Sequence, residues 1–261
     1  RPRLGRPADA VRYLPRGERA DATPRLLERL GDDLDLANTL ITFDGVGDPL
    51  LHPRLPALIT LARQAGAASI HVRTSLLAET EQLDALLETR PDVISIDLHA
   101  DRRDTYRALM GDPLGPDSFR EVLQRIEYLL RHRRRAAGTT SRLLPWIVPR
   151  MLRCAETLED MNSFFDRWQH LINAVTLDHA PVDHEPDGPT LLPTRPPQDY
   201  VSEQLGCRMI VLADGGVPID ECTLDGSDCI GNIHTMAPTQ LWPALRAERA
   251  NRAPNLGLFR P

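Results

Sequence analysis

The segment Phe43-Asp44-Gly45-Val46-Gly47-Asp48-Pro49-Leu50-Leu51-His52 carries the strongest fold signal in this chain. The apolar run before it, Leu40–Phe43, predicts a buried strand, and a helical pattern follows over residues 54–65. A glycine turn at the carboxyl end of a strand is where α/β proteins hold their ligands. Glycine lets a ligand approach bare backbone, and Asp48 offers a carboxylate to an ammonium or hydroxyl group. An ordinary strand-to-helix turn is the alternative explanation of this segment taken alone.

The rest of the chain up to residue 180 alternates apolar runs with amphipathic segments. Strands are expected at residues 40–43, 69–72, 93–98, 144–148 and 175–177. Helices are expected at residues 23–30, 54–65, 79–88, 118–135 and 158–171. This alternation predicts a parallel sheet with right-handed crossovers. Because five strands cannot close an eight-stranded barrel, we expect a partial (β/α) barrel, open on one side, with a doubly wound sheet as the alternative.

The chain is expected to have three parts. Residues 1–180 form the partial barrel, and residues 181–200, with six prolines in twenty positions, form a linker or extended arm. Residues 201–261 form a small cysteine-bearing extension. In it, residues 209–219 predict a hairpin around Asp214-Gly215-Gly216, and residues 241–250 predict a closing helix.

Composition limits the classes of partner. With 41% hydrophobic and 26% charged residues, the 261-residue chain is an ordinary globular protein, and its net charge of −6 gives no overall attraction to nucleic acid or anionic membranes. The basic run at residues 131–135 is interpreted as a solvated helix end. Neither a membrane-spanning run nor a signal peptide is visible in the sequence, and a cytoplasmic location is expected.

The chain has four cysteines, Cys154, Cys207, Cys222 and Cys229, and the last three are the candidate metal ligands. Without signs of secretion they indicate free thiols or metal ligands more than a disulfide framework. Cys207, Cys222 and Cys229 fall within 23 positions and flank the predicted hairpin, as the ligands of metal knuckles do. Thiolates suit iron–sulfur clusters or zinc. Buried or incidental thiols are the alternative, and Cys154 is expected to be a small core residue.

Several segments, in their order along the chain, resemble radical S-adenosylmethionine (SAM) proteins with a SPASM or twitch-type extension. Gly45-Val46-Gly47-Asp48-Pro49 stands where that family has Gly-Gly-Glu-Pro, with Val46 and Asp48 departing from the pattern. Further similar segments are Arg73-Thr74-Ser75-Leu76-Leu77, Val93-Ile94-Ser95-Ile96-Asp97 and Tyr106-Arg107-Ala108-Leu109-Met110-Gly111, then Phe119, Cys207, Cys222, Asp225, Gly231-Asn232 and Trp242. The resemblance covers nearly the whole chain.

The resemblance lacks the family's defining loop. A Cys-x-x-x-Cys-x-x-Cys segment holds the cluster that cleaves SAM, and this sequence has no cysteine before Cys154. Because the sequence begins at Arg1 and lacks the first strand, truncation just after that loop is the simpler expectation, and a degenerate member that lost its cluster is the rival. At most one auxiliary cluster could form in the extension. Its fourth ligand would be Cys154, another side chain or a substrate atom.

The resemblance implies a mechanism and a site. A [4Fe–4S] cluster and SAM would yield a 5′-deoxyadenosyl radical that abstracts hydrogen from a substrate, which in this family is often a peptide or protein. In the implied site the SAM ammonium would be met by Gly45, Gly47 and Asp48. Its ribose or carboxylate would be faced by Thr74, Ser75, Ser95 and Asp97, and Arg150 would pair with the carboxylate. The implied cofactor-binding residues are Gly45, Gly47, Asp48, Pro49, Thr74, Ser75, Ser95, Asp97 and Arg150. Helix capping after the strand is the alternative for Ser95 and Asp97.

Two other functions stay open on the sequence. Acids and histidines recur near strand ends, as in a barrel hydrolase with a divalent metal, at Asp44 and His52, Asp97, His99 and Asp101, Asp178 and His179, and Asp183 and His184. A non-catalytic scaffold that binds a peptide or partner protein is the third possibility. Structural zinc held by Cys207, Cys222, Cys229 and His234 would fit that scaffold. Without the cluster loop, the chain alone is expected to be inactive.

Overall fold

A parallel sheet forms the centre of the molecule. The computed structural model describes residues 22–45, 47–137, 144–179, 207–220, 224 and 226–256. In these residues the sheet has the order β1-β2-β3-β4-β5, and all four neighbouring pairs are parallel. The strands are β1 (Leu40–Phe43), β2 (Ser69–Thr74), β3 (Val93–Asp97), β4 (Trp146–Arg153) and β5 (Thr176–His179). Sequential order in a parallel sheet is the arrangement of a (β/α) barrel, and five strands make an incomplete one.

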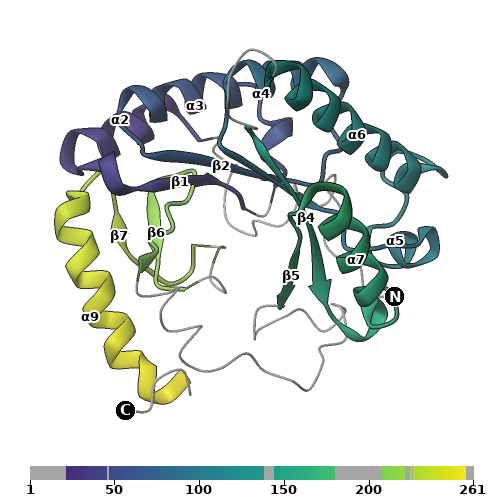
Figure 1. Ribbon diagram of the computed structural model, residues 1–261. Coiled ribbons are helices and arrows are strands. Elements are labelled where there is room, and N and C mark those ends of the chain that lie inside the picture. Colours follow the sequence, from purple (N-terminus) through teal and green to yellow (C-terminus); the bar gives the residue numbers. More distant parts are fainter. Residues whose placement is uncertain are drawn as a thin grey trace.

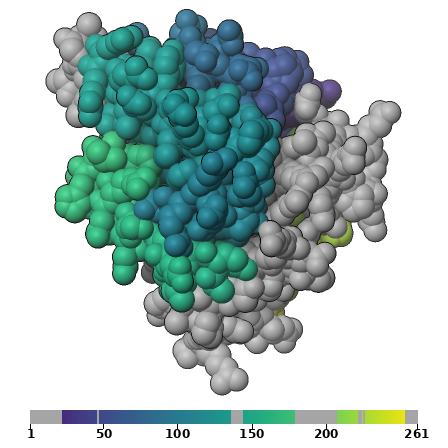
Figure 2. All heavy atoms as spheres, turned by 90° about the vertical axis from the view of Figure 1, so that its right-hand side faces the viewer, coloured from purple at the N-terminus to yellow at the C-terminus, as the bar shows by residue number. Residues whose placement is uncertain are grey.

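Helices follow the sheet along one side and connect its strands (Figure 1). The α-helices are α2 (Pro24–Asp33), α3 (Leu55–Gln64), α4 (Thr80–Glu88), α5 (Arg103–Met110), α6 (Ser118–Ala137), α7 (Met161–Ile172) and α9 (Pro238–Leu256). Short 3₁₀ turns are η1 (Leu36–Asn38), η2 (Pro49–Leu51) and η3 (Ala155–Thr157). Seen from the side of α5, α6 and α7, these segments form a continuous outer surface (Figure 2). No helix in the described ranges is long and apolar enough to cross a membrane.

The two faces of the sheet differ in polarity. Side chains that point toward the helices are apolar and buried, such as Ile70, Val72 and Ile94, each 0% exposed. Their neighbours along the strands, such as His71 and Arg73, are half-buried and point to the opposite side. Because successive side chains of a strand alternate between faces, the second set shares one face, which we call the inner face.

The sequence predicted the fold class and most elements correctly. The five-stranded parallel sheet of an incomplete (β/α) barrel is confirmed. The fourth strand differs from its prediction, since β4 runs through Pro149 to Arg153 and does not end at residue 148. Proline lacks one N–H donor, which signals a strand end in sequence, but the pairing of β3 with β4 continues past it. Arg150 therefore lies inside β4. Helix α5 was not predicted.

The cysteine-bearing extension contains a small antiparallel sheet. Its strands are β6 (Gly216–Pro218) and β7 (Cys229–Asn232). The predicted hairpin within residues 209–219 is corrected, because β6 pairs with β7 and residues 209–212 form no strand. A turn bond from Gly215 N–H to Leu212 O (2.9 Å) holds those residues beside β6. Val217, Ile219 and residues of α9 form a second apolar cluster that also includes Leu26 of α2.

We predict a large difference between two matched substitutions. Leu86 on α4 is 0% exposed in the main core, whereas Leu158 is 54% exposed. Leu86→Ala should lower the free energy of unfolding by about 2–5 kcal/mol, because it leaves a cavity in a packed interior. Leu158→Ala should change it by less than about 1 kcal/mol. Urea denaturation followed by circular dichroism measures both, and equal losses would contradict the placement of α4 against the sheet.

Candidate functional site

A glycine turn with free space around it follows β1. Gly45 has φ +143°, and a Cβ placed on Gly45 or Gly47 would meet no atom of the described residues within 4 Å, its chain neighbours aside. Val46, between them, lies outside the described residues. The backbone of both glycines is therefore not shielded by a side chain of their own at the carboxyl end of the sheet, where the sequence analysis expects a ligand.

Asp48 holds this turn against the end of β2. Its Oδ1 accepts a hydrogen bond from Leu50 N (3.0 Å), while its Oδ2 accepts from Thr74 Oγ1 (2.9 Å) and Ser75 N (3.0 Å). Pro49 starts η2 directly after it. Burial raises the pKa of Asp48, although these three donors oppose the shift. A carboxylate has about four acceptor positions, so one is left for a ligand.

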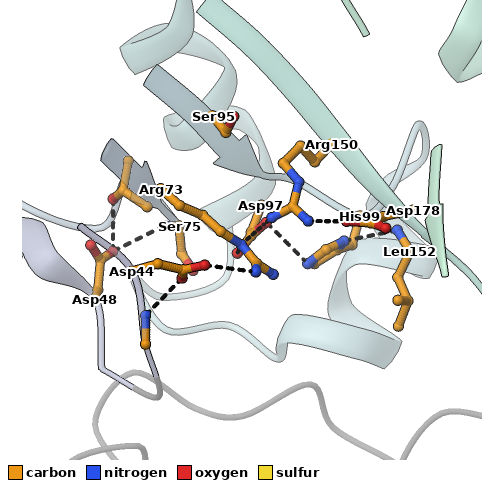
Figure 3. Close-up of polar contacts among 12 residues, drawn as sticks. Asp44, Asp48, Arg73, Ser75, Ser95, Asp97, His99, Arg150, Leu152 and Asp178 are labelled. Carbon is orange, nitrogen blue, oxygen red and sulfur yellow. Dashed lines mark hydrogen bonds and ion pairs between the residues drawn. The ribbon is translucent and has the colours of Figure 1, made fainter. Parts of the chain in front are cut away.

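A chain of alternating charges crosses the inner face at the carboxyl ends of the strands (Figure 3). We call it the charge ladder, and its members are Asp44, Arg73, Asp97, Arg150 and Asp178, one from each strand or the residue directly after it. Every neighbouring pair of the ladder makes an ion pair between opposite charges.

The distances along the ladder are short. Arg73 reaches Asp44 through Nη1 (3.1 Å to Oδ2) and Asp97 through Nε (3.0 Å to Oδ1 and 2.8 Å to Oδ2). Arg150 Nη1 donates to Asp97 Oδ1 (2.8 Å), and its Nη2 donates to Asp178 Oδ2. Asp97, the central carboxylate, is held by both guanidinium groups.

The ladder sets the charge states of its members. Burial by itself would raise the pKa of Asp97, but His99, Arg73 and Arg150 together outweigh burial and lower it. Burial would likewise lower the pKa of Arg73, and the carboxylates of Asp97 and Asp44 reverse this and raise it. The central carboxylate is therefore ionised and both its partners are cationic at neutral pH.

His99 ties the exit of β3 to β4 beside the ladder. Its backbone N–H donates to Arg150 O (2.9 Å), and its Nδ1 accepts from Leu152 N (3.0 Å). Because Nδ1 accepts, the ring proton lies on Nε2, which faces Asp97 Oδ1 at 3.8 Å. Burial lowers the pKa of His99 to about 4, so the ring is neutral at pH 7. The neutral ring of His99 thus accepts from Leu152 N–H, which in a regular sheet would donate to a backbone carbonyl oxygen of the neighbouring strand.

A second polar row lies two residues before the ladder on the first three strands. We call it the lower row, and it consists of Thr42, His71 and Ser95. His71 Nε2 and Ser95 Oγ are hydrogen-bonded at 2.8 Å, and His71 Nδ1 lies 3.4 Å from Thr42 Oγ1. Burial lowers the pKa of His71. Ser95 itself is only 5% exposed, so its hydroxyl is covered by this contact.

The predicted site residues therefore fall into three groups. Gly45, Gly47, Asp48, Pro49, Thr74 and Ser75 gather at the glycine turn, Asp97 and Arg150 belong to the ladder, and Ser95 belongs to the lower row. The sequence prediction of a SAM site did not include Arg73 or His71. A period-two pattern in the sequence could have identified both residues, because Arg73 lies two residues after His71 on a strand whose intervening residues are apolar.

The cysteines do not form a metal site within the described residues. Cys154 is buried beside Thr157, with Sγ 3.5 Å from Oγ1, which confirms its prediction as a core residue. Cys207 is exposed and Cys229 is half-buried, whereas Cys222 lies outside the described residues. Among the described residues, no group of three His, Cys, Asp or Glu side chains could hold a metal. The acids of the ladder are instead paired with arginines.

Solved structures with a similar fold are radical SAM enzymes. Streptococcus suis SuiB bound to the precursor peptide SuiA matches with a TM-score of 0.62 and 11% identity, over 91% of this chain and 62% of that one. SuiB bound to SAM matches with a TM-score of 0.55 and 9% identity, over 86% and 60%. The enzyme anSMEcpe with bound SAM gives 0.59 and 13%, over 87% and 70%. The chain shares the fold of these solved proteins.

These similarities have a limited reach. The chain spans about 60% of the length of the SuiB structures that it matches. No protein-family model matches the sequence, and neither does any curated protein. The likeness therefore establishes the fold, and the geometry of the inner face has to support any function.

We predict that His99 makes stability depend on pH in the acid range. The folded pKa of His99 is about 4 and its ordinary value is 6.5, so the unfolded chain takes up a proton in this window that the folded chain does not. The free energy of unfolding should therefore fall as the pH is lowered from 6.5 to 4, by up to about 3 kcal/mol from this group. Denaturant titrations at several pH values measure this slope.

The matched variant is His99→Gln, whose amide oxygen can accept from Leu152 N without titrating. It should flatten the slope between pH 6.5 and 4, whereas His170→Gln on the exposed side of α7 should leave the slope unchanged. His71 contributes a slope of the same sign in all three proteins. An identical slope in wild type and His99→Gln would show that His99 is not held neutral.

Proposed function

We propose that this chain carries the SAM-binding barrel and the cysteine-bearing extension of a radical SAM-type protein that modifies a peptide or protein substrate. The observation that supports this most is the open glycine turn at the carboxyl end of β1, in a fold shared with SAM-bound enzymes. The same end of the sheet holds the carboxylates and guanidinium groups that an amino acid cofactor requires.

The glycine turn fits the methionine part of SAM. The backbone of Gly45 and Gly47 borders free space, so their carbonyl groups can accept from the SAM ammonium. Asp48 keeps the turn in place through its bonds to Leu50, Thr74 and Ser75, and its remaining acceptor position adds a carboxylate contact. In this proposal Asp48 serves first to shape the turn and second to bind the ligand.

The ladder fits the carboxylate of SAM. Both terminal nitrogens of Arg150 already donate to Asp97 and Asp178, so a bidentate pair with SAM would have to displace one of these acids. Arg73 donates through Nε and Nη1, and its Nη2 makes no hydrogen bond within the described part of the chain. We therefore assign the first contact with the SAM carboxylate to Arg73, and Arg150 supports it through Asp97.

The [4Fe–4S] cluster does not fit the residues of this chain that the structure describes. Such a cluster would supply the electron that cleaves SAM, and its three-cysteine loop is absent from the 261 residues. No reaction step is therefore assigned to the cluster. We expect the chain by itself to bind SAM without cleaving it, and a longer polypeptide or a partner would have to supply the loop.

The substrate class is proposed from a structural neighbour. SuiB is bound to a precursor peptide in one matching structure, and this chain covers 62% of that protein. A non-catalytic scaffold would also bind such a peptide, and only SAM binding together with cleavage in a complete protein separates the two.

We predict that the purified chain binds SAM at the glycine turn. Gly47→Val should weaken binding at least tenfold, because a branched side chain fills the free space while the backbone conformation is one that valine can adopt. Equilibrium dialysis with radiolabelled SAM gives the dissociation constant, and saturation-transfer NMR detects binding that is too weak for dialysis.

The control is Ala68→Val, the same kind of enlargement at the amino end of β2. Ala68 is exposed there, so this variant should bind SAM as wild type does. Thermal unfolding of both variants shows that they fold. Equal SAM binding by Gly47→Val and wild type would remove the glycine turn from the site, and no binding by wild type would refute the proposed function.

A further inference from the structure

The loop that leaves β2 contains a buried residue in a left-handed conformation. Leu76, two residues after the end of β2, has φ +60° and is 0% exposed. A residue other than glycine adopts this conformation at a cost, because its Cβ crowds the following carbonyl oxygen. Such a residue persists only where its surroundings fix it, and these positions cluster at ligand sites. The contacts that fix Leu76 are therefore informative about the neighbouring glycine turn.

The non-glycine residues with positive φ in the described part of the chain are of two kinds. Arg90 and Asn173 follow the last turns of α4 and α7, where a left-handed residue is an ordinary helix end. Leu76 and His99 instead follow β2 and β3, each two residues after the last residue of its strand. The two strained strand exits thus lie at the edge of the sheet that carries the glycine turn and the ladder.

A short hydrogen-bonded path links Leu76 to Asp48. Leu76 N–H donates to Thr74 Oγ1 (2.9 Å), and the same hydroxyl donates to Asp48 Oδ2 (2.9 Å). Ser75 N–H, which lies between them in the chain, donates to the same carboxylate oxygen at 3.0 Å (Figure 3). Because a hydroxyl has one proton and accepts through a lone pair, the bond from Leu76 orients the Thr74 proton toward Asp48. The conformation of Leu76 therefore sets both of these donors to Oδ2.

The carbonyl group of Leu76 is held by a residue that is distant in sequence. Arg125 Nη1 on α6 donates to Leu76 O at 3.0 Å. The side chain of Arg125 is only 14% exposed, and its acidic neighbour Glu79 is 73% exposed and 4.0 Å away. Helix α6 is itself fixed, since Val122 and Ile126 are 0% and 1% exposed in the main core. A charged donor bonds a carbonyl oxygen more strongly than a neutral one. Arg125 thus connects the helix layer to the exit of β2.

We propose that Arg125 is a positioning residue of the SAM site. Its guanidinium group holds Leu76 in the left-handed conformation, so that Thr74 and Ser75 donate to one oxygen of Asp48 and fix the orientation of that carboxylate. Arg125 therefore acts through the exit of β2. The proposal rests on the proposed function for the identity of the ligand, whereas the arrangement of Asp48 is a property of the chain without ligand.

The first measurement is the pKa of Asp48, followed by ¹³C NMR of its carboxyl group in the complete chain without SAM. Burial raises this pKa, the hydrogen bonds of the turn and of the β2 exit lower it, and the charge of Asp97 raises it further. In Arg125→Met the bonds from Thr74 and Ser75 should loosen. The pKa of Asp48 should therefore rise above its value in wild type.

SAM binding gives the second readout and the comparison with control variants. By equilibrium dialysis, Arg125→Met should raise the dissociation constant about fivefold, the effect of losing one hydrogen bond. Arg125→Lys keeps a charged donor, so it should lie closer to wild type in both measurements. Arg131→Met removes the same group from the same helix, where Arg131 is 57% exposed and pairs with Glu127, so this variant should match wild type.

The outcomes separate the role of Arg125 from the proposed function. An Asp48 pKa or a SAM affinity that is unchanged in folded Arg125→Met would overturn that role, and so would an equal change in Arg131→Met. Should circular dichroism show that Arg125→Met is unfolded, hydrogen exchange of the Leu76 amide in wild type decides. Exchange as slow as in the core strands supports a fixed exit, and exchange as fast as in exposed loops overturns it. Failure of wild type to bind SAM would refute the proposed function and leave the titration of Asp48 to be measured.

Discussion

The central carboxylate of Asp97 organises the carboxyl end of the sheet. Two guanidinium groups from neighbouring strands donate to it, and each also holds an outer acid, so five strands are joined by one alternating row of charges. Removing one member of a partly buried row leaves its partner unpaired, which is far more costly than losing a surface ion pair. The open sheet thus keeps the positions of its strand ends even though the barrel is incomplete.

The two faces of the sheet lie in different environments. Its outer face is filled with aliphatic side chains that pack against helices, which explains the strength of the periodic signal in the sequence. Its inner face carries arginine, aspartate and histidine inside strands that otherwise look fully buried. Burying such polar side chains in an apolar core would be costly. Their presence on the inner face is therefore the reason to expect ligand binding on that side.

The sequence predicted the elements well because strand and helix periods are local properties. Residues 40–43 and 69–72 could be assigned from their own apolar character, and the turn from Gly45 to Pro49 from its composition. The ladder could not be found in this way. That Arg73 meets both Asp44 and Asp97 depends on the register of three strands, which is not a local property of the sequence. The predicted end of the fourth strand at residue 148 was wrong, because pairing with the strands on both sides carries β4 through Pro149 to Arg153.

The extension shows the same limit. Residues 209–219 have the composition of a hairpin, but β6 pairs with a segment that begins eleven residues after it ends. Packing alone does not separate the two pairings, because Met209 and Val211 contact the same apolar cluster as Val217, Ile219 and Ile230. Local turn propensity cannot distinguish them either.

The exposure of each ion pair also determines how it responds to dissolved salt. Ions in solution weaken charge pairs that water surrounds, such as Arg102 with Glu159, whose side chains are 55% and 80% exposed. Arg150 and Asp97 are only 12% and 15% exposed, so counterions have little access to them. High ionic strength would therefore weaken the exposed ion pairs of the outer surface first. Within the ladder the same rule separates the end from the centre: Arg73 and Asp44, beside the glycine turn, are 32% and 38% exposed and would lose their attraction before Arg150 and Asp97 do.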